Sequence, residues 1–142
     1  MKFWKFGLVL KNRKIGEYNS MGLDIYISRK TASDKECLVH WHKFGSVAEW
    51  FKEKIYDGKL DGEERPLDYL ALVFLHENCV AALDSENWKE KMQEQLFPVK
   101  PDFVWTGRRE LAYLKMMETI AEDIEDVAEP GPGEKLLIQI TY

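Results

Sequence analysis

The stretch Met21-Gly22-Leu23-Asp24-Ile25-Tyr26-Ile27-Ser28 decides the fold class of this chain. Its apolar side chains fall on one face of an extended chain, and Asp24, Tyr26 and Ser28 fall on the other. This alternation predicts a β-strand with one face on a hydrophobic core. A second alternating run, residues 136–140, predicts a final strand that pairs beside the first.

The segments between these two strands favour helices. Residues 37–42 indicate one further strand, and Ser46 with Glu49 forms a capping-box pattern at the start of a helix. Four helices are expected, beginning near Ser46, Pro66, Asp84 or Ser85, and Thr106. The sequence therefore predicts an α+β fold in which a small antiparallel or mixed sheet packs against about four helices.

Charge divides the chain into two parts. Residues 1–20 contain five basic residues and one acidic residue, whereas residues 21–142 contain fifteen basic and twenty-four acidic residues. We expect a basic N-terminal extension at 1–20, which could form an extra strand, and a single α+β domain at 21–142. The acidic domain would be repelled by a phosphate backbone, so the charge favours a protein partner over nucleic acid.

Composition also bears on location. No apolar run approaches the roughly 18 residues that span a bilayer, and the apolar start of the chain has no cleavage site of the secretory type. The two cysteines, Cys37 and Cys79, form no disulfide framework. We therefore expect a cytoplasmic protein with no membrane partner.

Two blocks of sequence resemble a known family. Met21 to Tyr26 resembles the opening of small uncharacterised phage and prophage proteins, which begin Met-Gly-Leu-Asp-Met-Tyr. Residues 40–51 resemble the same family's later Trp and Trp-Phe block, although His42 stands where the family often has Arg, and Ala48 where it often has His. The resemblance implies an accessory protein made inside a bacterial host cell and supplies no established activity.

Several side chains could carry chemistry. Asp24, Tyr26, His40 and His42 would give an acid, a phenol and two imidazoles in one pocket if their strands are neighbours. The alternative is that they form the solvated face of an antiparallel sheet. No nucleophile motif or phosphate-binding loop accompanies them.

A metal site is the second chemical hypothesis. His76 and Cys79 are i, i+3 neighbours on the predicted central helix and could bind a metal together. Cys37 is expected to face away from His40 and His42 on its strand. Because the paired cysteines of zinc knuckles are missing, no metal or other cofactor is predicted.

Acidic residues crowd the end of the last predicted helix. Near a helix C-terminus they oppose the macrodipole, which a purely structural role would not favour. We expect them to form an interaction surface for a basic protein groove. The candidate residues are Glu118, Glu122, Asp123, Glu125 and Asp126.

The functional prediction is a phage or prophage accessory protein. It would act by binding a host or phage protein, for example a defence or replication factor, and binding is favoured over catalysis. One alternative is a small enzyme or ligand-binding protein with a polar pocket at Asp24, Tyr26, His40 and His42. A structural component of the virion is a second alternative. The sequence leaves the oligomeric state open.

Overall fold

The computed structural model describes residues 22–142, so the predicted basic extension at 1–20 lies outside the described residues. Four strands pair antiparallel in the order β2-β1-β4-β3. They are β1 (Asp24–Lys30), β2 (Lys35–His42), β3 (Arg65–Leu67) and β4 (Lys135–Thr141). The predicted α+β fold is confirmed, and the last strand pairs beside the first, as expected.

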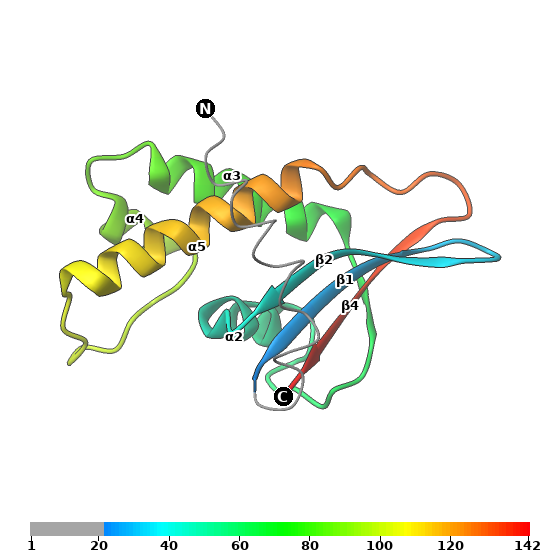
Figure 1. Cartoon of the computed structure of the whole chain (residues 1–142), viewed down its shortest axis with the longest axis horizontal. Helices are drawn as coiled ribbons and strands as arrows, with labels where there is room; N and C mark the ends of the chain where they lie inside the picture. Colours follow the sequence, from blue (N-terminus) through cyan, green and yellow to red (C-terminus); the bar gives the residue numbers. More distant parts are fainter. Residues whose placement is uncertain (1–21) are drawn as a thin grey trace.

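Four helices complete the described part of the chain. They are α2 (Gly45–Lys54), α3 (Tyr69–Leu83), α4 (Trp88–Gln95) and α5 (Gly107–Glu125). Figure 1 shows α3 and α5 running beside each other, with β1 between β2 and β4 in the sheet. Among residues 22–142, no helix combines the length and apolar character needed to cross a bilayer.

The core lies between the helices and one face of the sheet. Ile25 and Ile27 of β1 and the alternate residues of β4 are fully buried and belong to the same apolar cluster as the inner side chains of all four helices. Removal of these apolar side chains from water is the main source of stability in a domain of this size. The other face of the sheet carries Asp24 and Tyr26 of β1 and His40 of β2.

Two helix starts show how local chemistry sets the boundaries. Thr106 caps α5 as predicted, because its hydroxyl accepts the N–H of Arg109. The predicted start at Pro66 is wrong. Pro66 lies in β3, and α3 begins three residues later, where the carboxylate of Asp68 accepts the N–H of Leu70.

The capping box at Ser46 is also wrong. Phe44 occupies the N-cap of α2 without a side-chain hydrogen bond, and Ser46 lies inside the helix with its hydroxyl 3.4 Å from that of Tyr113. Ser85 accepts the N–H of Asn87 but precedes the N-cap of α4, which is Asn87 itself. Both helices therefore begin at a position other than the one that local propensity favoured.

An irregularity in β2 changes which residues share a face. Ile27 pairs with Val39, but the next residue, Ser28, pairs with Cys37, so Leu38 is an extra residue in β2. Directly opposed residues in antiparallel strands point to the same side. Cys37 therefore lies on the same side as Ser28, and the prediction that it faces away from the histidines is wrong.

Candidate functional site

The polar face of the sheet brings four predicted site residues together. In the pairing of β1 with β2, Asp24 lies opposite His42 and Tyr26 opposite His40. Residues two apart on a strand share a face, so all four side chains point to the side away from the apolar core. The acid, the phenol and the two imidazoles thus lie together on one face of the sheet, and the predicted pocket around them stays a prediction.

Asp24 joins the two histidines. Its Oδ1 lies 2.7 Å from Nε2 of His40 and 2.8 Å from Nδ1 of His42. Asp24 is 4% exposed and His40 is 7% exposed, and a buried carboxylate is stable only with such partners. We name these three residues the Asp24 cluster.

The two hydrogen bonds select the tautomers of the imidazoles. A carboxylate can only accept, so His40 donates from Nε2 and His42 donates from Nδ1. The other nitrogen of His40, Nδ1, is buried and has no hydrogen-bond partner within residues 22–142. Nδ1 of His40 is therefore a buried ring nitrogen whose bonding capacity the described residues leave unused.

Tyr26 holds the ring of His40 from one side. The two rings are stacked, with centroids 4.6 Å apart and planes inclined by 3°. Burial raises the pKa of the Tyr26 phenol, and the nearby charge of Asp24 and the Cys37 thiol raise it further. Tyr26 thus remains a protonated phenol at neutral pH and contributes a fixed aromatic surface.

Two backbone features place His42. Lys43 has a φ of 63°, and its N–H donates to the carbonyl of Leu23 at 2.7 Å, which ends β2 directly after His42. On the other side, a Cβ atom added to Gly22 would lie 2.5 Å from Cε1 of the His42 ring. Gly22 belongs to the quoted opening stretch, but alternation gave no reason to assign it a role.

The Asp24 cluster has the composition of a metal site. One ligand atom from each residue can be chosen so that all three lie within 4.8 Å of one another. Two imidazole nitrogens and a carboxylate oxygen are ligands that suit Zn²⁺ and related divalent transition metals. Within residues 22–142 it is the one such group of three or more ligating side chains.

The other predicted metal pair gains no third ligand in the described part of the chain. Cys79 is fully buried in the core, and this burial raises the pKa of its thiol to about 12. The thiolate, which is the form that binds metal, is therefore disfavoured. His76 and Cys79 belong to no metal-ligating group among the described residues.

The predicted acidic surface on α5 loses two of its members. Glu122 and Asp123 are buried, and Oδ2 of Asp123 accepts the indole N–H of Trp41 at 2.8 Å. A buried indole N–H needs an acceptor, and α5 supplies one from a residue that was predicted to belong to the acidic interaction surface. The remaining candidates are Glu118, which is half-buried, and Glu125 and Asp126, which are exposed.

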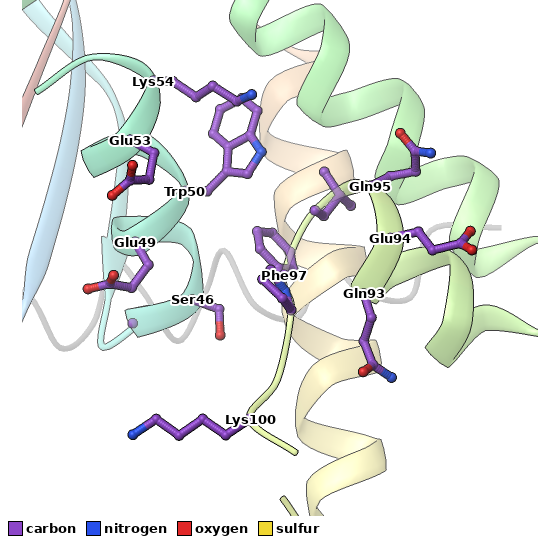
Figure 2. A pocket seen from close by; sticks show the side chains of 13 residues that line it. Ser46, Glu49, Trp50, Glu53, Lys54, Gln93, Glu94, Gln95, Phe97 and Lys100 are labelled. Carbon is purple, nitrogen blue, oxygen red and sulfur yellow. The ribbon is translucent and has the colours of Figure 1, made fainter. Parts of the chain in front are cut away.

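A groove of about 880 Å³ lies elsewhere, between α2 on one side and the end of α4 with the segment that follows it on the other. Figure 2 shows Trp50 and Phe97 inside it, with Lys54 and Lys100 toward its two ends. Both aromatic side chains are almost completely buried. None of the polar-face residues lines it.

Comparison with known proteins does not extend these observations. The chain matches no protein-family model, and no curated protein or solved structure is significantly similar to it. The resemblance to phage and prophage proteins therefore stays a prediction, and the geometry of the Asp24 cluster carries the functional argument.

Proposed function

We propose that this chain is a metal-binding protein whose site is the Asp24 cluster. The observation that carries the proposal is that one carboxylate oxygen lies within 2.8 Å of a ring nitrogen from each of two histidines. This hypothesis develops the alternative of a ligand-binding protein with a polar pocket at these residues. Zn²⁺ is the probe ion of choice because it accepts mixed nitrogen and oxygen ligands.

Binding requires the protons on Nε2 of His40 and Nδ1 of His42 to move to the other nitrogen of each ring. In the metal-free cluster, Nε2 of His40 and Nδ1 of His42 donate to Asp24, and a metal would take these positions as the common partner of all three ligand atoms. The low exposure of Asp24 and His40 weakens the screening of the ion by water. The negative charge of the carboxylate then balances part of the charge of the ion.

Nδ1 of His40 limits the affinity of the Asp24 cluster for a metal ion. When a metal binds Nε2, a neutral imidazole carries its proton on Nδ1, and a ligating histidine normally donates that proton to an acceptor. Within residues 22–142 Nδ1 of His40 has no such acceptor. A buried unsatisfied donor costs about 1–3 kcal/mol, so we expect weaker binding than at a fully supported zinc site.

The ligand count suggests an exchangeable site. Tetrahedral zinc takes four ligands, and structural sites supply all of them from the protein. The Asp24 cluster supplies three, which leaves a position for water or for a ligand from solution. This supports a binding or catalytic role for the ion over a purely structural one.

Direct titration tests the proposal. Protein without a histidine tag is titrated with Zn²⁺ by calorimetry, and its bound metal is measured by elemental analysis after dialysis. Wild type should bind one ion. Asp24→Asn and His42→Ala should each weaken binding by at least about 100-fold, because each removes a ligand and loss of outer-shell support alone costs 10–100-fold.

His76→Ala is the matched control. It removes a histidine from α3 and leaves the Asp24 cluster intact, so its affinity should equal that of wild type. Sub-stoichiometric binding by wild type, or an equal loss in His76→Ala and His42→Ala, would contradict the proposal.

Protein binding is a second proposal, and exposed apolar side chains on α3 favour it. Leu70 and Phe74 are one helical turn apart and are 68% and 41% exposed. Large apolar side chains exposed together often mark a docking surface. The accessory role in a phage or prophage, and the host-cell cytoplasm as its setting, stand as predictions beside this proposal.

Matched substitutions can test this surface. Leu70→Lys should abolish cross-linking to a specific partner in bacterial lysate, whereas Val104→Lys should retain it, because Val104 is 61% exposed but lies outside α3. Equal loss of cross-linking in both variants would show that partner binding does not depend on the exposed surface of α3.

A further inference from the structure

The ring of His42 lies in the space that a side chain at position 22 would occupy. A Cβ atom at position 22 would lie 2.5 Å from Cε1, 3.1 Å from Nε2 and 3.3 Å from Nδ1 of that ring. Real Cβ atoms essentially never approach other heavy atoms within 3.0 Å. The absence of a side chain at Gly22 thus lets the backbone pass directly against the imidazole.

The need for glycine here is one of space and not of backbone conformation. The glycines with positive φ in the described residues are Gly58, Gly62 and Gly133. Gly22 is not among them, so alanine at this position would suffer no left-handed strain. The conflict created by a methyl group at position 22 is with the His42 ring.

We propose that Gly22 is a positioning residue for the Asp24 cluster, an inference that rests on the proposed metal-binding function. The close backbone holds the His42 ring with Nδ1 directed at Oδ1 of Asp24, 2.8 Å away. The His42 side chain is 20% exposed, so it can turn outward when the space is filled. The three atoms nearest to this methyl group all belong to His42, and none belongs to the Asp24–His40 bond, which is 2.7 Å long.

The first experiment compares two glycine-to-alanine variants by Zn²⁺ titration. Gly22→Ala should weaken binding by about 10–100-fold, the range observed when support of a ligand is lost. Gly45→Ala is the matched control, because no atom lies within 4 Å of its added Cβ and its φ is not positive. It should bind Zn²⁺ within about twofold of wild type.

A double-mutant cycle separates an effect on the position of the His42 ring from a general loosening of the domain. If Gly22 acts through His42, then Gly22→Ala should cause no further loss of affinity in a His42→Ala background. An equal loss in both backgrounds would show that the methyl group disturbs the domain at large and would overturn the inference.

A metal-free measurement distinguishes this inference from the proposed function. Nitrogen NMR of the imidazoles at one fixed pH should show His42 losing its Nδ1–H tautomer in Gly22→Ala, while His40 keeps its Nε2–H tautomer. An unchanged His42 spectrum would overturn the positioning role even if wild type binds Zn²⁺. Wild type that binds no Zn²⁺ would instead overturn the metal function and, with it, the role of Gly22 in metal binding.

Discussion

The two faces of the sheet differ in what they do with the same strands. On the helix-covered face, Ile25 and Trp41 are opposed across β1 and β2 and are buried in the core. One residue along each strand, Asp24 and His40 lie on the other face and are joined by a hydrogen bond. The comparison teaches that alternation allows one pair of strands to provide stability on one side and polar chemistry on the other.

The two faces also differ in how their burial is compensated. Apolar side chains gain free energy when they leave water, whereas a buried carboxylate or imidazole loses hydration and needs a partner. Asp24 satisfies this requirement through both histidines, but Nδ1 of His40 has no partner among the described residues. We therefore expect substitutions on the helix-covered face to change stability most, and substitutions on the polar face to change metal binding most.

The largest expected effect is on the helix-covered face. Trp41→Ala removes a side chain that is almost fully buried and leaves the buried Asp123 without the indole N–H. The free energy of unfolding should fall by about 3–5 kcal/mol, measured by urea denaturation. Leu111→Ala, at an exposed position on α5, should change it by about 0.5 kcal/mol or less. A similar value for both variants would remove the distinction between core and surface.

The second-largest expected effect is a gain in stability when metal binds on the polar face. Zn²⁺ at a free concentration about 100 times its Kd should raise the free energy of unfolding by about 2.7 kcal/mol, because the ion binds the folded state. His40→Ala removes one ligand and should abolish this gain in thermal or urea denaturation. An equal gain in the variant would place the bound ion elsewhere.

The two cysteines differ in burial, and the buried one makes the stability of the domain depend on pH. Burial raises the pKa of Cys79 to about 12 from its ordinary value of 9.0, so the unfolded state loses this proton first as pH rises. The stability that depends on the protonated thiol is complete below pH 9.0 and is lost as pH rises toward 12. Between about pH 8 and about pH 10, wild type should lose about 1.4 kcal/mol from this group.

Cys79→Ala lacks this contribution, so its difference in stability from wild type should narrow by the same amount over that interval. The exposed Cys37 should react with a thiol reagent in the native protein, whereas Cys79 should react only after unfolding. Rapid labelling of Cys79 under native conditions would contradict its place in the core.

The smallest expected effect concerns the ring stacked on His40. Tyr26→Phe keeps the aromatic surface, and Tyr26→Ala removes it. Relative to Tyr26→Phe, the alanine variant should lose about 0.5–1.5 kcal/mol of stability beyond the loss of buried area, measured by urea denaturation. If the phenylalanine variant loses as much as the alanine variant, the hydroxyl and not the stack is the important feature.

The parts of the fold that sequence could predict are those set by neighbours along the chain. Alternation around Ile25 gave the strand and its polar face, and the hydroxyl of Thr106 gave the start of α5. The start at Pro66 was wrong because an edge strand tolerates proline as well as a first helical turn does. The residues next to Pro66 in the sequence do not distinguish a proline in an edge strand from a proline in the first turn of a helix.

The candidate site was predictable as a set of residues but not as an arrangement. Asp24, Tyr26, His40 and His42 were named from their residue types and from the shared faces of two strands. The sharing of one carboxylate oxygen by two imidazoles depends on the register between β1 and β2, which the spacing does not specify. The role of Gly22 depends on a contact across 20 residues and has no periodic signal.

By itself, the sequence determined the α+β class, the burial of one strand face and the polar character of the other, since these follow from side-chain alternation. Only the tertiary structure decided that an extra residue in β2 brings Cys37 to the side of Ser28, and that Asp123 is buried as the acceptor for Trp41. The physical reason is the same in both cases. Strand register and helix orientation are fixed by packing between distant segments, and this packing chooses which polar groups become partners.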